Sequence, residues 1–224
     1  MPPVAAGGLE LQLTASRKAL LGLAALGLLS LGLLSWVDDP LWRWLPDGAR
    51  WIAEVRLPSL SVCFALCLVI ASSALRLPRR DTRWRPLLAA SAAWLLVSAV
   101  ILLCGGGIHV ALPRTADLVA YLGTGLLAEE LLFRGALQEL AERAFPGRRL
   151  GPFPFAIFIQ AVFFSASHAQ YQGFSFGAAL PQIALTLPMG ILFGWVFSLS
   201  GSLWPVVLLH FANNALPLAL GHPR

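Results

Sequence analysis

The sequence predicts an all-α fold, a polytopic bundle of about seven transmembrane helices, with an eighth helix at the membrane surface as an alternative. Of its 224 residues, 58% are hydrophobic and only 12% are charged, whereas a soluble domain carries about 25% charged residues. The apolar residues form long runs, and a helix needs about 20 of them to cross a bilayer. These observations indicate an integral membrane protein.

Seven apolar runs are long enough to be spans, and we interpret residues 1–224 as a single integral membrane domain. The runs cover residues 19–37, 58–75, 86–104, 116–138, 153–169, 177–199 and 203–220. The fourth run differs from the others because it contains charged residues, which lower its mean hydropathy. Pro152-Phe153-Pro154 begins the fifth run, and Gly201-Ser202 links the last two.

The eighth helix, if present, is predicted within part of residues 38–57. Tryptophans in and beside it alternate with charged residues, as expected for anchoring at headgroup level. They are Trp36, Trp42, Trp44 and Trp51.

Basic residues gather in three places that fall on one side of a seven-span bundle. They are Arg17-Lys18, the five arginines of 76–85 and the three arginines of 139–150. Because positive loops face the cytoplasm, we expect a cytoplasmic N-terminus, an external C-terminus and a location in the bacterial inner (plasma) membrane. The net charge of +5 is then a topology signal, so we expect the lipid bilayer and not nucleic acid as a partner.

Three cysteines lie in or near apolar runs, at Cys63, Cys67 and Cys104. An odd number inside hydrocarbon argues against a disulfide framework. Free cysteine often behaves as a small hydrophobic residue, so we interpret all three as packing residues.

The fourth run contains three ionisable residues within one and a half turns, Glu129, Glu130 and Arg134. Such residues in a span are costly, face the bundle interior and indicate function. Glu130 and Arg134 are four apart and share a helix face, so we expect a buried ion pair. Glu129 points about 100° away and is able to face a cavity. If all three formed one ion-pair lock they would be structural, but their surplus negative charge favours a general base.

Two later runs each carry a histidine. His168 ends the fifth run and shares a face with Phe164, and alone it could simply bind a neighbouring helix. His210 and Asn214 share a face of the last run, and two hydrogen-bond donors in a dry site can stabilise an oxyanion. Asn213 points elsewhere, and we expect it to contact another helix.

Together these blocks resemble the CAAX-protease and bacteriocin-processing (CPBP, or ABI) family of intramembrane endopeptidases. The family pattern is Glu-Glu-x-x-x-Arg, Phe-x-x-x-His and His-x-x-x-Asn on separate transmembrane helices. This chain has all three in that order, at Glu129–Arg134, Phe164–His168 and His210–Asn214. The resemblance covers about residues 116–220, the expected catalytic core, whereas residues 1–115 carry no motif and their spans have no assigned role.

The resemblance implies an enzyme that hydrolyses a peptide bond in a membrane-associated protein or peptide. The substrate would be the C-terminal end of a prenylated protein, a leader peptide or a C-terminal sorting segment, and no residue chooses among them. Carried over residue by residue, the roles are water activation by Glu129 and His168, oxyanion stabilisation by His210 and Asn214, and support by Glu130 and Arg134.

Metal dependence stays open at this point. Glu129, His168 and His210 make a His2Glu set, which with water could hold catalytic zinc. The His-Glu-x-x-His helix of zincins is absent from the sequence, and Asn214 suits an oxyanion hole better than a metal shell. We favour a glutamate protease without a cofactor, with a metalloprotease that uses zinc or another divalent metal as the alternative.

Two rival functions come from other classes. A rhomboid-like serine protease needs a Gly-x-Ser-Gly loop, and the sequence around Ser200 and Gly201 lacks the first glycine. A bacteriocin-immunity or transport protein would bind without cutting, but a transporter should show repeated, broken helices in two halves. Here the polar residues lie only in the second half.

The expected depths of the site residues disagree. By the arginine count, Glu129 lies nearer the cytoplasmic end of its run, whereas His168 lies near the external end of its own. Either the boundaries are off by a turn or two, or the site lies at mid-depth on tilted helices.

Overall fold

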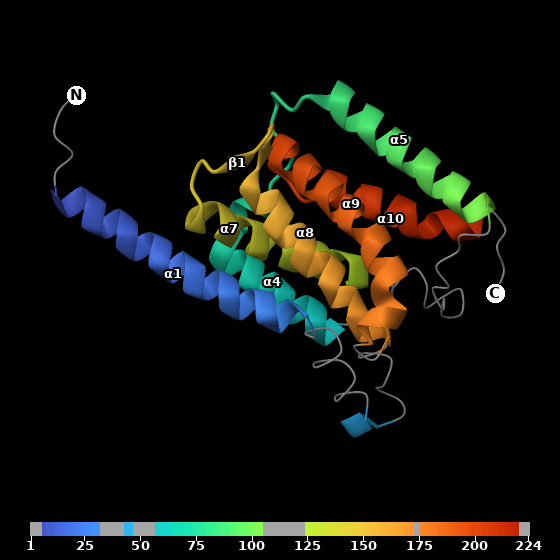
Figure 1. Ribbon diagram of the computed structural model, residues 1–224, viewed down its shortest axis with the longest axis horizontal. Coiled ribbons are helices and arrows are strands. Elements are labelled where there is room, and N and C mark those ends of the chain that lie inside the picture. The colour runs from blue at the N-terminus through green and yellow to red at the C-terminus, as the bar shows by residue number, and fades with distance from the viewer. Residues whose placement is uncertain (1–5, 32–42, 47–56, 105–123, 173–174, 220–224) are drawn as a thin grey trace.

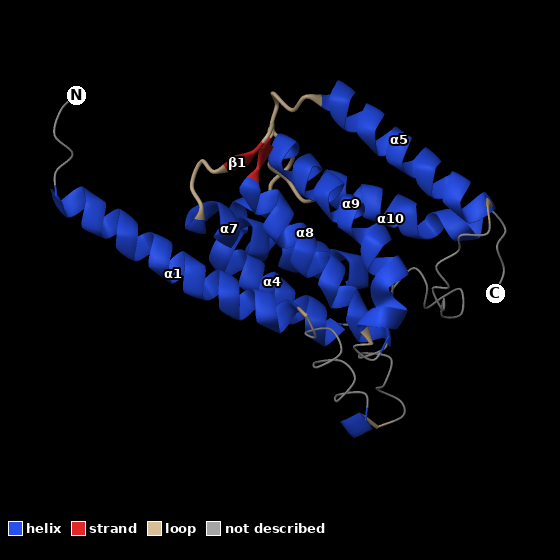
Figure 2. Ribbon diagram, viewed as in Figure 1, coloured by secondary structure: helices blue, strands red, loops and turns tan. Residues whose placement is uncertain are grey.

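The computed structural model describes residues 6–31, 43–46, 57–104, 124–172 and 175–219, and most of them are helical (Figures 1 and 2). The first half contains α1 (Ala6–Ser30), α4 (Leu57–Ala71), the 3-10 helix η2 (Ser72–Leu75) and α5 (Trp84–Leu103). The second half begins with a helix over 124–130 that continues into the π-helix η3 (Leu131–Gln138) and α7 (Glu139–Ala144). It ends with α8 (Phe155–Ser167), the 3-10 helix η4 (His168–Gln172), α9 (Phe176–Ser200) and α10 (Trp204–Ala219).

The structure confirms the all-α fold class, and each of the seven predicted runs overlaps a described helix. Three stretches are long and apolar enough to cross a membrane, Pro58–Leu75, Trp84–Leu103 and Gly177–Ser200. The shorter apolar helix Phe155–Gln170 matches the fifth run. The chain is therefore an integral membrane protein, and its number of spans stays a prediction. Most of 38–57, where an eighth helix was expected, lies outside the described residues.

A minimal β-ribbon was not predicted. The strands β1 (Arg149–Leu150) and β2 (Phe153–Pro154) pair antiparallel between α7 and α8. The turn between them begins at Gly151, whose φ of 59° is a conformation that residues with a Cβ rarely adopt. The ribbon fixes the loop that leads into α8.

The π-helix η3 forms the centre of the bundle, and all eight of its residues are buried. It packs against α4, α8, α9 and α7. In Figure 1, α8 runs through the middle of the bundle with α1 and α4 on one side and α9 on the other, while α5 lies at the outer edge beside α10. Polar side chains on η3 must therefore find partners inside the protein.

Small residues bring the helices around η3 close together. A Cβ on Gly135 would lie 2.5 Å from the Cys67 sulfur on α4. Membrane helices commonly pack through small residues because the backbones can then approach. Cys63 and Cys67 are fully buried free thiols, which confirms their role in packing, but Cys104 is exposed. The packing role expected for Cys104 was therefore wrong: it follows the last residue of α5, beyond the bundle interior.

The expected depth of Glu129 was wrong because the predicted fourth run ended too early. The helix extends past 138 to Ala144, through polar residues that lower the hydropathy. Glu129 therefore lies 15 positions before the helix end, which is about 20 Å at about 1.5 Å per residue. His168 directly follows the end of α8, whose first residue, Phe155, contacts Phe145 with ring centres 5.5 Å apart. Both Glu129 and His168 therefore lie in the half of the bundle away from the arginines.

The loops at the other end of the bundle, over 76–83, 145–153 and 201–203, define its arginine-rich end. Gly201 ends α9 with a φ of 63°, in the left-handed region that favours glycine. Three hydrogen bonds join the end of η2 and the first loop to the end of α9 and the turn that follows it. They are Arg79 N–H to Ser200 O at 3.0 Å, Leu203 N–H to Ala74 O at 2.9 Å and the Ser202 hydroxyl to Arg76 O at 2.7 Å.

Candidate active site

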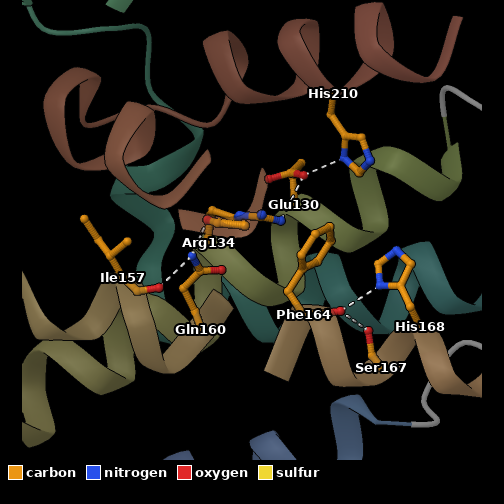
Figure 3. Close-up of polar contacts among 9 residues, drawn as sticks. Glu130, Arg134, Ile157, Gln160, Phe164, Ser167, His168 and His210 are labelled. Carbon is orange, nitrogen blue, oxygen red and sulfur yellow. Dashed lines mark hydrogen bonds and ion pairs between the residues drawn. The ribbon is translucent and has the colours of Figure 1, made fainter. Parts of the chain in front are cut away.

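A fully buried carboxylate forms the centre of the candidate site. Glu130 Oε1 accepts a hydrogen bond from Arg134 Nη1 at 3.0 Å, which confirms the expected ion pair. The same oxygen lies 2.7 Å from His210 Nδ1 on α10. One carboxylate oxygen therefore joins the helix that carries the two glutamates to the last helix of the bundle (Figure 3).

Aromatic rings enclose the guanidinium group of Arg134. Its central carbon lies 4.2 Å from the centre of the Phe164 ring and 5.1 Å from that of Phe193. Arg134 Nε and Nη2 are buried and, among the described residues, have no hydrogen-bond partner. A guanidinium over an aromatic face is attracted by the ring quadrupole. The two phenylalanines therefore compensate in part for the missing hydrogen bonds.

The ring of His168 has a defined orientation. His168 Nδ1 lies 2.7 Å from the backbone oxygen of Phe164. A carbonyl oxygen can only accept, so Nδ1 carries the proton, and in the neutral ring Nε2 is the basic nitrogen. The ring also packs edge-on against Phe164 at 4.9 Å. His168 is therefore held with a proton-accepting nitrogen on the side of the ring away from α8.

Glu129 lies on another face of its helix from Glu130. It is 9% exposed, whereas Glu130 is wholly buried. Its charge acts on the imidazole of His168 and on the guanidinium of Arg134. The two adjacent glutamates therefore differ in burial, and Glu130 is the one that forms the ion pair with Arg134.

The two asparagines of α10 differ in their contacts. Asn213 Oδ1 accepts hydrogen bonds from Trp94 Nε1 at 2.9 Å and from the Ser98 hydroxyl at 3.1 Å. This confirms that Asn213 contacts another helix, α5. Asn213 Nδ2 donates to Asn214 Oδ1 at 3.1 Å. The Asn214 amide is thereby oriented with its amino group as the other polar end, and its oxyanion role stays a prediction.

The expected site residues come from three segments of the chain, and the structure brings several of them together. The Phe164 ring contacts both histidine rings, with centres 4.9 Å from His168 and 6.1 Å from His210. Figure 3 shows it between Arg134 and the two histidines. Among the described residues, Asn214 forms its hydrogen bond with Asn213 and none with Glu130 or His210.

Sequence reasoning missed Phe193 and the π-helical geometry of η3. Phe193 contacts the ring of His210 at 5.0 Å as well as Arg134. Nothing distinguishes it from the other apolar residues of α9. A π-helix has no reliable sequence pattern, although such segments often occur at functional sites.

The proposed metal ligands do not form a metal site in this arrangement. Within the described ranges, no three histidine, cysteine, aspartate or glutamate side chains are grouped so that they could hold one metal ion. His210 Nδ1 instead contacts Glu130. Metal dependence therefore stays a prediction, with the glutamate protease favoured and zinc or another divalent metal as the alternative.

Ser200, the serine of the rival protease motif, is buried and hydrogen-bonded within a turn. Ser200 is fully buried at the arginine-rich end. Its hydroxyl donates to Ser202 O at 3.0 Å and accepts from Ser202 N–H at 3.3 Å. These contacts stabilise the turn between α9 and α10, which is the role expected of a serine beside a left-handed glycine.

Comparison with known proteins finds a match only in the second half of the chain. No curated protein and no solved structure matches it. A family model described as "Type II CAAX prenyl endopeptidase Rce1-like" matches residues 111–216. This segment contains the two glutamates, Arg134, both histidines and Asn214. Over this segment the chain is similar to the Rce1-like family of type II CAAX prenyl endopeptidases, a family of proteases.

Proposed function

We propose that the protein is an intramembrane endopeptidase in which Glu129 and His168 activate water for attack on a peptide bond. The observation that carries this proposal is the division of labour between the two glutamates. Glu130 is buried against Arg134 and His210, while Glu129 lies on another face of the same helix and is 9% exposed. A carboxylate beside a basic imidazole nitrogen is suited to general-base catalysis.

The proton transfers follow from these positions. Glu129 or His168 Nε2 takes one proton of the water while its oxygen attacks the carbonyl carbon. The same group returns the proton to the leaving amine when the carbon–nitrogen bond breaks. Because His168 Nδ1–H is bound to Phe164 O, Nε2 is the nitrogen available for this exchange in the neutral ring.

His210 and Asn214 stabilise the oxyanion in this proposal. When His210 is protonated, its Nδ1–H donates to Glu130 and its Nε2–H is a donor for the substrate oxygen. The amino group of Asn214 is a second donor, since its oxygen accepts from Asn213. Removal of one such donor from an oxyanion hole typically slows catalysis by about 10²–10³-fold.

The substrate in this proposal is a membrane-associated protein or peptide, and the reaction requires no metal. A direct test compares purified wild type, Glu129→Ala and Asp81→Asn on three peptide classes: a prenylated C-terminal peptide, a leader peptide and a C-terminal sorting segment. Each is assayed with and without phenanthroline. Asp81 lies in an exposed loop, so its substitution controls for the loss of one carboxylate.

The expected result is cleavage by wild type and Asp81→Asn, none by Glu129→Ala, and no effect of the chelator. Loss of cleavage with phenanthroline and its recovery with zinc would replace this mechanism with a metalloprotease. Absence of Glu129-dependent cleavage of all three classes would favour an immunity or transport function.

A further inference from the structure

A cavity lies at the arginine-rich end and has no part in the proposed chemistry. Its volume is about 460 Å³. We call it the arginine pocket; its charged lining residues are Arg79, Arg148, Arg149, Glu139 and Glu142. Glu142 follows Glu130 by 12 positions on one continuous helix, which is about 18 Å at about 1.5 Å per residue. The arginine pocket and the candidate active site are therefore separate.

Glu142 is a carboxylate that forms no ion pair with a described residue. Within the described residues, its side chain accepts one hydrogen bond, from Gln138 Nε2 at 3.5 Å, and forms no ion pair. The other glutamate of the pocket, Glu139, pairs with Arg143 at 3.3 Å. Burial and the neighbouring Glu139 raise the pKa of Glu142, against the opposing charge of Arg79. A ligand with a positive group would give Glu142 an ion-pair partner at direct contact, which no described cation provides.

Two arginines that line the pocket are cations without an ion-pair partner among the described residues. The guanidinium of Arg148 lies over the rings of Phe145 and Phe155, at 6.0 and 5.2 Å from their centres. The guanidinium of Arg79 packs against Gly201, where no side chain intervenes. Neither forms an ion pair with a described carboxylate within 4 Å. Both residues are exposed at the mouth of the pocket, and their planar guanidinium donors match the oxygens of a phosphate group.

The depth of the arginine pocket suggests the source of such a ligand. The spans Pro58–Leu75 and Gly177–Ser200 both end at the loops that line it, and a span ends where hydrocarbon gives way to headgroups. Apolar side chains of Ala156 and Phe197 complete the lining. A headgroup in the pocket would therefore remain attached to acyl chains beside α8 and α9.

We propose that the arginine pocket binds the phosphoethanolamine headgroup of a membrane phospholipid, with the phosphate on Arg79 and Arg148 and the ammonium on Glu142. An ethanolamine ammonium donates three hydrogen bonds, whereas the choline ammonium donates none. The pocket should therefore prefer phosphatidylethanolamine to phosphatidylcholine with the same acyl chains. The pocket should also prefer phosphatidylethanolamine to phosphatidylglycerol, which has the phosphate but no positive group for Glu142.

The test is native mass spectrometry of the delipidated full-length protein titrated with these three lipids. Wild type should bind phosphatidylethanolamine at least about tenfold more tightly than the other two, which corresponds to about one charged hydrogen bond. Glu142→Gln should abolish this preference. Arg79→Gln should weaken the binding of all three lipids. Arg80→Gln is the matched control, because Arg80 is the exposed neighbour in the same loop and does not line the pocket.

Three outcomes would overturn the proposal. Equal binding of phosphatidylethanolamine and phosphatidylglycerol, unchanged by Glu142→Gln, would leave a site for anions alone. Soluble phosphoethanolamine that competes as well as the lipid would exclude a lipid as the source. If Arg79→Gln and Arg80→Gln lose lipid affinity equally, the lipids are attracted to a basic loop and do not bind in the pocket. Lipid-free melting temperatures of the variants distinguish lost binding from lost folding.

Discussion

Glu130 Oε1 lies 2.7 Å from His210 Nδ1, across 80 positions of sequence. The same oxygen accepts a hydrogen bond from Arg134 at 3.0 Å. All three side chains are at most 2% exposed. A single buried oxygen therefore fixes the position of the last helix relative to the helix of the two glutamates, and with it the orientation of the His210 ring.

Substitution of Glu130 by glutamine should destabilise the protein as well as inactivate it. The change leaves the Arg134 charge buried without a counter-charge, and breaking a buried pair in this way costs roughly 3–5 kcal/mol. We expect a lower thermal unfolding midpoint in detergent, with Asp81→Asn unchanged. A Glu130→Gln protein that keeps its midpoint and loses only cleavage would place Glu130 in the chemistry.

Substitution of Glu129 by glutamine should reduce activity and leave stability almost unchanged. Glu129 is 9% exposed, and the carboxylate in the ion pair with Arg134 is that of Glu130, so the unfolding midpoint should stay close to that of wild type. Cleavage should fall by about 10²–10⁴-fold, the usual contribution of a general base. The measurement is kcat on a peptide that wild type cuts. Retention of most activity would remove Glu129 from the mechanism.

Local spacing predicted the parts of the site that depend on one helix. The four-residue interval predicted the Glu130–Arg134 pair, and the 100° step predicted a different environment for Glu129. The contact between Glu130 and His210 could not be predicted, because it depends on how two distant helices pack. Phe193 carries no signal, since phenylalanine is ordinary in a membrane helix.

The helix boundaries show a second limit of the sequence. Hydropathy ended the fourth run at 138 because Glu139, Glu142 and Arg143 follow, but a helix continues wherever its backbone is satisfied. These residues lie at the arginine-rich end, where charge is tolerated. With the helix ending at Ala144, Glu129 and His168 lie in the same half of the bundle.

The close approach of α4 and η3 gives a prediction about packing. Gly135→Ala should destabilise the protein by about 1–3 kcal/mol, the usual cost of overpacking a core, because its Cβ would lie 2.5 Å from the Cys67 sulfur. Cys67→Ala removes this sulfur, and the next contacts are then 3.4 Å or longer.

The double variant should therefore be more stable than the sum of the two single changes predicts, a coupling measured by a double-mutant cycle of unfolding. Additive effects would show that the two helices do not meet at this pair.

Glu142 should make stability depend on pH. Its pKa is raised by burial and by Glu139, so the folded protein favours the protonated carboxyl more than the unfolded chain does. The stability that this provides is present below the ordinary value of 4.5 and is lost as the pH rises through the raised pKa.

The difference in melting temperature between wild type and Glu142→Gln should therefore change with pH above 4.5, to the disadvantage of wild type at higher pH. Asp81→Asn serves as the control that should follow wild type. A difference that is constant with pH would contradict the raised pKa.

The native thiols offer a test of orientation that also decides how a substrate reaches the site. Cys104 is exposed at the end of α5 far from the arginines, while Cys63 and Cys67 are fully buried. A membrane-impermeant maleimide should therefore label wild type at Cys104 alone among the described cysteines. Arg148→Cys in a Cys104→Ser background places one exposed thiol at the opposite end.

If the arginine-rich end is cytoplasmic, intact cells should label Cys104 and inverted vesicles should label position 148. Labelling of both from one side would refute the arrangement of the helices across the membrane. Glu129 lies about 20 Å from the arginine-rich end by helix rise, in a hydrocarbon core about 30 Å thick. The face that labels Cys104 is therefore the nearer face to the candidate site, and external labelling would favour exported peptides over cytoplasmic prenylated proteins as substrates.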